Sequence, residues 1–144
     1  MKFFAGLNPW VFPLAAAASF IFGGIWYGLL SKQWMAAANL SREAIEAKGG
    51  PSPKPFVITF IAQTFMAWML AGVLLHMVKS GIPATMANGM ITATFLWAGF
   101  VMTSLVVNHQ FQMQKGILTL IDGAHWLGVL LIQGAIIGVW GLAR

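Results

Sequence analysis

The amino-acid sequence predicts an all-α membrane protein, with four transmembrane helices in an antiparallel bundle that forms a single domain over residues 1–144. The composition gives the first reason: 59% of the residues are hydrophobic and only 8% are charged, whereas soluble domains contain about 25% charged residues. The second reason is length, because four apolar stretches reach the roughly 20 residues that a helix needs to cross the hydrocarbon core. No stretch has the alternating pattern of a barrel strand.

The first predicted span covers residues 10–30 and follows Asn8-Pro9, a pair that is typical of a helix start. No charged residue occurs between Lys2 and Lys32. This interval is much longer than the apolar core of a cleaved signal peptide, so we interpret it as a retained span.

A short helix is expected in the loop that follows, within SREAIEAKGG at residues 41–50. Ser41 can cap such a helix and Glu43 suits its positive end, while the two glycines stop it. An apolar side would place this helix on the membrane surface.

The other predicted spans cover residues 56–78, 84–107 and 120–142. The loops that separate these three spans are short. Neighbouring helices are therefore expected to form antiparallel hairpins.

The basic residues beside the spans predict the orientation, because cytoplasmic loops are enriched in Lys and Arg. The first and third loops contain Lys32, Arg42, Lys48, Lys54 and Lys115, whereas the other side has Lys2, Lys79 and Arg144. We expect a multi-pass protein of the inner (plasma) membrane with both termini outside the cytoplasm. The net charge of +5 is scattered between apolar runs, so nucleic acid is not an expected partner.

Small residues mark the expected helix-packing positions. In lipid, helices associate through close backbone contact at small side chains. The candidates in the first and fourth spans are Gly23, Gly24, Gly28, Gly134 and Gly138. Their neighbour would be another helix of the chain or of a second copy, so the expected partners are the lipid bilayer and a homo-oligomer or another membrane protein.

A group of polar residues surrounds the third loop, in NHQFQMQKGILTLIDGAHW at residues 108–126. The first span ends on the same side of the membrane as this loop. The residues expected to come together there are Tyr27, Asn108, His109, Asp122 and His125. Two imidazoles and a carboxylate could pass protons, and His109, Asp122 and His125 are also weak candidates for binding a transition metal.

The alternative is a structural role. Thr119 and Asp122 have the spacing of a capping box that opens the fourth helix. His109 would then end the third span in the headgroup region, and a hydrogen bond to Asp122 would satisfy His125. Both interpretations stay open at this point.

Polar side chains also occur deep within the predicted spans. Gln63 and Gln133 cannot face lipid without a large free-energy cost, so they are expected to hydrogen-bond between helices or to line a small hydrated cavity. Trp68 and Trp97 lie in the middle of the second and third spans and need an acceptor for their indole N–H groups, and Thr64, Thr94 or Gln133 is expected to supply it.

Several segments resemble one family of membrane proteins. They are Asn8-Pro9-Trp10, FGGIWYG at Phe22–Gly28, KQWM at Lys32–Met35, and LIDGAHWLGVLLIQGAIIGVW at Leu120–Trp140. Together they are similar to the bacterial integral membrane proteins grouped as domain of unknown function 1761. The resemblance implies a four-span protein of the inner membrane and brings no established activity.

Three hypotheses for the function follow. The first is a homo-oligomer that moves or senses a small solute or a proton, and the second is a non-catalytic accessory subunit of a larger membrane complex. The third is a metal or haem binder. No nucleophile is paired with a base and only three acidic residues are present, so we expect no enzyme activity and no cofactor.

Overall fold

The computed structural model describes residues 6–47, 49–50 and 52–142. Its helices are α1 (Val11–Leu29), α2 (Ser31–Ala37), α3 (Arg42–Ala47), α4 (Lys54–Lys79), α5 (Met86–Leu96), the π-helix η1 (Trp97–Met102), α6 (Thr103–Phe111) and α7 (Gly116–Trp140). Four helices are long and apolar enough to cross a membrane: α1, α4, the continuous helix α5–η1–α6, and α7. The predicted all-α, four-span fold is confirmed.

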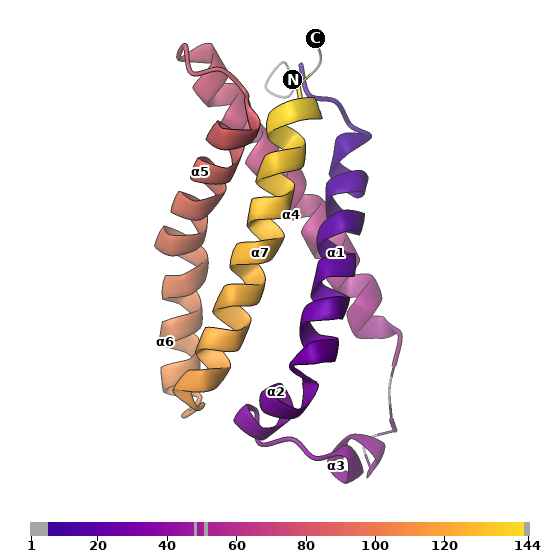
Figure 1. The fold of residues 1–144 in the computed structure, drawn as a ribbon. Helices are drawn as coiled ribbons and strands as arrows, with labels where there is room; N and C mark the ends of the chain where they lie inside the picture. The colour runs from indigo at the N-terminus through magenta and orange to yellow at the C-terminus, as the bar shows by residue number, and fades with distance from the viewer. Residues whose placement is uncertain (1–5, 48, 51, 143–144) are drawn as a thin grey trace.

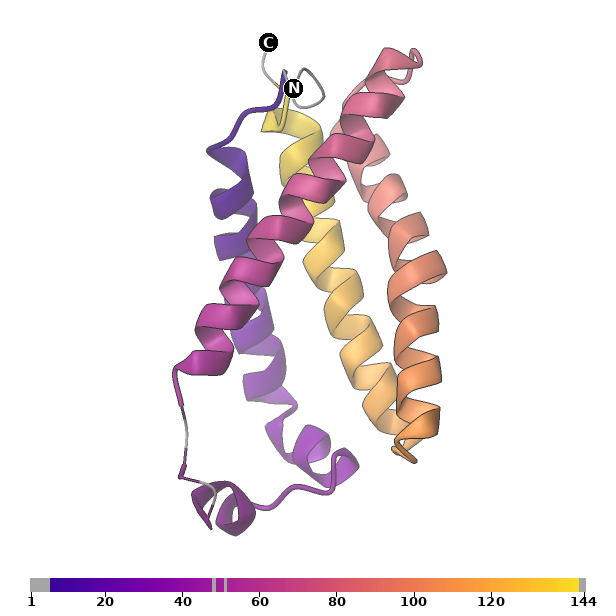
Figure 2. The same ribbon diagram turned by 180° about the vertical axis from the view of Figure 1, so that it is seen from behind.

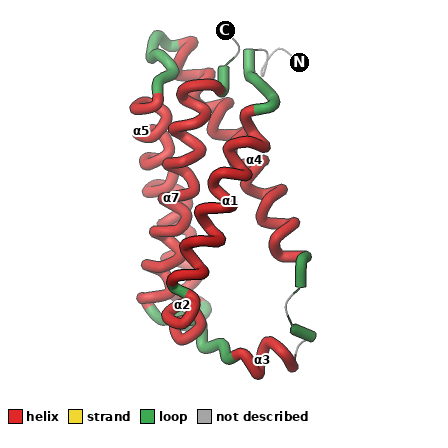
Figure 3. Tube along the Cα trace, turned by 45° about the vertical axis from the view of Figure 1, so that its right-hand side comes forward, coloured by secondary structure: helices red, strands yellow, loops and turns green. Residues whose placement is uncertain are grey.

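The four long helices form a bundle with α7 in the middle (Figure 1). Helix α1 lies on one side of α7 and the α5–η1–α6 helix on the other. Helix α4 lies behind α1 and α7 in Figure 1 and crosses both of them, as the view from the back shows (Figure 2). Leu7, Leu142 and the α4–α5 turn lie at one end of the bundle, which we call the terminal end. Helices α2 and α3 lie with the α6–α7 turn at the other end, which we call the loop end (Figure 3).

Helix α7 is the best covered of the long helices: 44% of its most apolar window is buried, compared with 11% for α5–η1–α6. Its closest neighbour is α5, because glycines face each other there. A Cβ atom on Gly89 would overlap the carbonyl group of Gly134, and one on Gly138 would overlap the carbonyl group of Thr85. The two backbones therefore pack directly against each other, as small residues allow in membrane helices.

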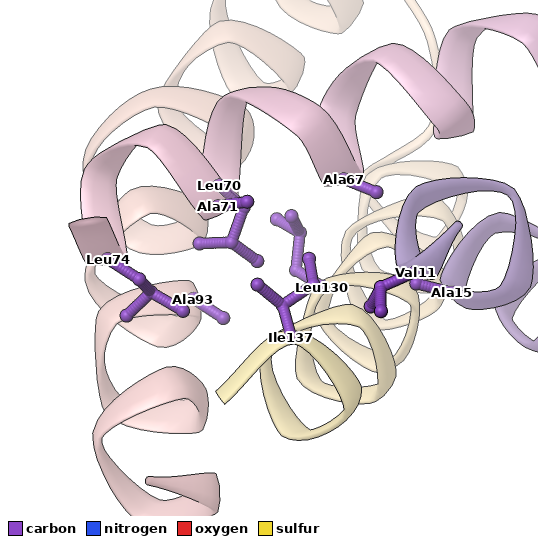
Figure 4. Packing of buried hydrophobic residues seen from close by; sticks show 9 residues of the cluster. All are labelled: Val11, Ala15, Ala67, Leu70, Ala71, Leu74, Ala93, Leu130 and Ile137. Carbon is purple, nitrogen blue, oxygen red and sulfur yellow. The ribbon is translucent and has the colours of Figure 1, made fainter. Parts of the chain in front are cut away.

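An apolar cluster fills the interior of the bundle (Figure 4), and most of its members belong to the helix turns nearest the terminal end. Its buried members come from α1, α4, α5 and α7: Val11, Ala15, Ala67, Leu70, Ala71, Leu74, Ala93, Leu130 and Ile137. Alanines occupy several positions at which helices meet, so α4 can cross the bundle at close range.

Asn8 connects the first span to the last one. Its backbone N–H donates to the Gly141 carbonyl at 2.9 Å, and its side-chain amide donates to the Trp140 carbonyl at 3.3 Å. These bonds occupy carbonyl groups at the end of α7 that have no partner within their own helix.

The first loop contains the expected helix and one that was not expected. The expected one is α3, where the Ser41 hydroxyl accepts a hydrogen bond from the Ala44 N–H at 3.1 Å. Hydrogen bonds from the Glu43 backbone N–H and from Ser41 hold the pKa of the Glu43 carboxyl below its usual value. The unexpected helix is α2, which follows α1 after a break at Leu30. Lys48, like Lys2 and Arg144 of the charge comparison, lies outside the described residues.

The fourth span begins earlier than predicted. A short turn, in which Met113 has a positive φ of 54°, separates α6 from α7, and α7 starts at Gly116. Thr119 and Asp122 are therefore inside the helix. The predicted capping box at these two residues is wrong, because the chain becomes helical one turn before Leu120.

Candidate functional site

Asp122 is the centre of a polar network at the loop end. Its Oδ1 atom accepts a hydrogen bond from the Tyr27 hydroxyl at 2.8 Å and another from the Trp34 indole N–H at 3.0 Å. These donors belong to α1 and α2, so one carboxylate of α7 connects three helices. The sequence analysis expected Tyr27 near Asp122, but it did not identify Trp34 as a partner of the carboxylate.

His109 continues the network on the other side of Asp122. Its Nε2 atom lies 3.9 Å from the second oxygen of Asp122, and its Nδ1 atom lies 3.0 Å from the Thr119 hydroxyl. The side chains of His109 and Asp122 are 12% and 16% exposed, so both are largely covered. Asn108 is not a member of this network, because its side chain is exposed and makes no hydrogen bond among the described residues.

A second contact holds α2 against the bundle. The Lys115 ammonium group donates a hydrogen bond to the Ala36 carbonyl at 2.7 Å, near the end of α2. A positive group is favourable there because helix carboxyl ends carry a partial negative charge. The sequence identified Lys115 as a charge beside a span, but no pattern in it indicated this partner.

His125 lies deeper in the bundle and faces α1. Its side chain is buried between aromatic rings: the Tyr27 ring centroid is 4.6 Å away, and the Phe22 ring is stacked at 6.1 Å. A Cβ atom on Gly23 would stand 2.8 Å from its Nε2 atom, so the glycine gives the imidazole its space.

The predicted hydrogen bond between His125 and Asp122 is wrong. The Nδ1 atom of His125 is buried and has no hydrogen-bond partner in the described part of the chain. The imidazole packs against aromatic rings, and the Asp122 oxygens face Tyr27, Trp34 and His109 instead.

A cavity of about 370 Å³ lies beside His125, between α1, α4 and α7. The residues that line it are Phe20, Gly23, Gly24, Tyr27, Gly28, Phe56, Thr59, Gln63 and His125. No atom lies within 4 Å of the position that a Cβ would take on Gly24 or Gly28. These two glycines thus form part of the cavity wall and pack against no other helix of this chain, while their contact with a second copy stays a prediction.

Three buried polar residues form a layer between the cavity and the apolar cluster. The Ser19 hydroxyl donates to Gln63 Oε1 at 2.9 Å, and Gln133 Nε2 donates to the Gln63 carbonyl at 3.0 Å and to Ser19 Oγ at 3.2 Å. Gln63 therefore combines the two expected roles, since it bonds between helices and also lines the cavity. The Oε1 atom of Gln133 is buried without a hydrogen-bond partner among the residues described.

Two tryptophans donate hydrogen bonds to carbonyl groups of α7. The Trp97 indole N–H bonds to Gly123 at 2.8 Å, and the Trp26 indole N–H bonds to Ile121 at 3.2 Å. The partners that were expected for Trp97 are therefore wrong. A backbone carbonyl replaces them because Trp97, the first residue of η1, faces α7.

The structure does not bring the three metal candidates together. His109 and Asp122 are neighbours, but His125 faces α1 and the cavity. Within the described residues, no group of three or more His, Cys, Asp and Glu side chains could hold a metal ion.

Comparison with known protein families shows to which family this chain belongs. The model of a family described as protein of unknown function (DUF1761) matches residues 10–138. The chain belongs to the DUF1761 family. The resemblance seen in the sequence motifs is thus confirmed. No curated protein and no solved structure matches the chain.

The matched region of this DUF1761 protein contains the whole candidate site. It extends from the start of α1 almost to the end of α7, and it includes the cavity, the Asp122 network and the Gln63 layer. The family description states no activity, so the function has to be argued from these residues.

Proposed function

We propose that this DUF1761 protein binds a small solute in the cavity between α1, α4 and α7, as the first step in moving or sensing that solute at the membrane. The main support is the imidazole of His125, a member of the cavity lining whose ring makes no hydrogen bond in the described part of the chain. Buried polar groups nearly always have a hydrogen-bond partner. A bound solute would supply one to the Nε2 atom, which lies beside Gly23 of the lining.

The packing on the terminal side of the cavity supports the same proposal. The apolar cluster fills the bundle toward the terminal end, and the layer of Ser19, Gln63 and Gln133 lies between that cluster and the cavity. The exposed Phe56 leaves the cavity open between α1 and α4. A cavity that is closed on one side and open on another admits a solute from one direction, and this property is useful both for transport and for sensing.

Tyr27 connects the cavity to α2 through hydrogen bonds. It lines the cavity, and its hydroxyl donates to the Asp122 oxygen that also accepts a hydrogen bond from Trp34. A solute that displaces Tyr27 would weaken the contact between Asp122 and α2. We therefore include sensing, with α2 as the element that responds, in the proposal.

The substitution Gly24→Leu tests the proposal, because its side chain would fill the cavity. The position has open space and lies in a helix, where replacing glycine improves helix propensity by up to about 1 kcal/mol, so the protein should fold. After incubation with a small-molecule extract of membranes, the wild type should retain a bound compound in native mass spectrometry, and Gly24→Leu should lose it.

Gly99→Leu is the matched control. Gly99 also has open space at its Cβ position, and it lies in η1, away from the cavity lining. This variant should retain the compound like the wild type. A wild-type protein that retains no compound, or a Gly24→Leu variant that retains as much as the wild type, would contradict the proposed function.

A further inference from the structure

The cavity lining contains no charged side chain. Its polar members are the hydroxyl groups of Tyr27 and Thr59, the amide of Gln63 and the imidazole of His125. A charged solute would lose its hydration there without meeting an opposite charge, and such transfers are strongly unfavourable. The nearest carboxylate is that of Asp122, which already accepts hydrogen bonds from two donors. The lining therefore favours a neutral ligand.

The shape of the lining favours a flat ring. Gly23, Gly24 and Gly28 give the α1 side of the cavity a wall of bare backbone. The aromatic rings of Phe20 and Phe56 belong to the same lining and are in edge-to-face contact, with centroids 6.3 Å apart. Aromatic rings attract further rings at such separations. The volume of about 370 Å³ is near the lower limit for small-molecule pockets, which suits one or two fused rings.

The unused hydrogen-bonding groups favour a ligand with an acceptor. Because Gln63 Oε1 accepts from Ser19, the other end of the same amide is the N–H donor Nε2, and it has no acceptor among the described residues. Tyr27 donates its only hydroxyl proton to Asp122. Besides Thr59, the donors left for a ligand are thus Gln63 Nε2 and, in the suitable tautomer, His125 Nε2, which lies beside Gly23 of the lining. A carbonyl oxygen is the neutral acceptor that matches them.

We infer that the cavity binds a neutral, planar ring that carries carbonyl oxygens, which is the chemistry of a quinone headgroup. This inference rests on the proposed function and names its ligand class. A neutral ring dissolves in the bilayer. Phe56, which belongs to the lining, is 62% exposed on the surface of the bundle, so the ring can enter between α1 and α4 from the lipid.

Three probes with the same ring system test the inference. They are 2-methyl-1,4-naphthoquinone, the hydrocarbon 2-methylnaphthalene, which has no acceptor, and the charged 1,4-naphthoquinone-2-sulfonate. Each is dialysed to equilibrium between lipid nanodiscs that contain the protein and empty nanodiscs of the same lipid, so that partition into lipid cancels. The neutral quinone should accumulate on the protein side. The hydrocarbon should bind about tenfold more weakly, because it leaves the donors unpaired, and the sulfonate should show no excess.

Two variants locate the binding. His125→Phe keeps an aromatic ring but removes the nitrogen atoms, and it should weaken binding of the quinone by about fivefold to tenfold without changing that of the hydrocarbon. Gly24→Leu should abolish binding of both, whereas Gly99→Leu should bind both like the wild type. Far-ultraviolet circular dichroism checks that each variant is folded.

The results separate the ligand class from the proposed function. If the hydrocarbon binds as tightly as the quinone, or if the quinone shows no excess that Gly24→Leu removes, the inferred class is wrong. The proposed function still stands in that case if native mass spectrometry finds another compound that Gly24→Leu displaces. If Gly24→Leu displaces no compound in either experiment, both proposals fail.

Discussion

At the scale of single residues, Asp122 is the side chain that connects α1, α2 and α6 to α7 in the candidate site. It accepts hydrogen bonds from Tyr27 and Trp34 and faces His109. Donors that point to a carboxylate form stronger bonds than neutral pairs do. Removal of this side chain would leave a phenol hydroxyl and an indole N–H without their acceptor.

We expect Asp122→Leu to lower the free energy of unfolding by about 1.5–3 kcal/mol, because two largely covered donors lose their partner. Asp122→Asn should have a smaller effect, since its amide oxygen can still accept both hydrogen bonds. Thermal unfolding in a mild detergent, followed by circular dichroism, measures both changes. Asn108→Leu is the control, because the Asn108 side chain is exposed and should change stability by less than about 0.5 kcal/mol. Equal effects of Asp122→Leu and Asn108→Leu would contradict the structural role of the carboxylate.

The residue-level predictions show what spacing along a helix can and cannot indicate. Loop lengths correctly brought Tyr27, His109 and Asp122 to one end of the bundle. The predicted pairing of Asp122 with His125 failed because residues three apart on a helix differ in direction by about 60°. That difference is enough for Asp122 to face the Tyr27 hydroxyl, Trp34 and His109 while the His125 ring packs against the rings of Phe22 and Tyr27. The identity of the facing helix is not visible in the spacing.

At the scale of helices, α3 was predicted and α2 was not, for a physical reason. Helix α3 has a capping serine and a stop signal in its own sequence. Helix α2 has only seven residues and no side-chain cap, and short helices are unstable alone in water. Contacts with distant residues hold it: Trp34 with Asp122 and Lys115 with Ala36. Such contacts can be seen only in the folded chain.

The glycine motifs gave a similar mixture of results. Gly134 and Gly138 do lie against another helix, and the partner position Gly89 could have been found from the small residues Thr85 and Ala93, which flank it at four-residue spacing. In contrast, Gly24 and Gly28 face open space in this chain. A pair of glycines at this spacing thus does not distinguish a helix contact from a cavity wall.

The contact between α5 and α7 leads to a prediction about stability. Gly89→Val should destabilise the protein by about 1–3 kcal/mol, because its side chain would overlap the Gly134 carbonyl and force the two helices apart. Gly99→Val on the same membrane span is the control, since its Cβ position is open. Unfolding by sodium dodecyl sulfate in mixed micelles gives both values. A Gly89→Val protein as stable as the control would mean that α5 and α7 do not pack backbone to backbone.

At the scale of the whole molecule, the two halves of the bundle have different interiors. Apolar side chains fill the half toward the terminal end, whereas the half toward the loop end contains the cavity and the polar network. Composition and span lengths correctly predicted the four helices. They could not predict the cavity, because it depends on how α4 crosses α1 and then separates from it toward Lys54 (Figure 3). That crossing is set by the packing of many side chains.

The orientation of the whole molecule in the membrane stays a prediction, and it has a direct test. Among the described residues, Lys32, Arg42, Lys54 and Lys115 lie at the loop end, whereas Lys79 lies at the terminal end. This excess predicts that the loop end faces the cytoplasm. The sequence has no cysteine, so single cysteines can be introduced without background labelling. Ser80 and Gln112 are suitable positions, because both are exposed and lie in turns at opposite ends.

In spheroplasts of the expressing bacterium, a membrane-impermeant maleimide should label Ser80→Cys at once and Gln112→Cys only after lysis. The reason is that a basic loop is kept on the cytoplasmic side during insertion. The reverse pattern would place α2, and with it the Asp122 network, outside the cytoplasm. A solute sensed through α2 would then be signalled to the exterior. The labelling pattern therefore also decides which compartment would receive the proposed signal.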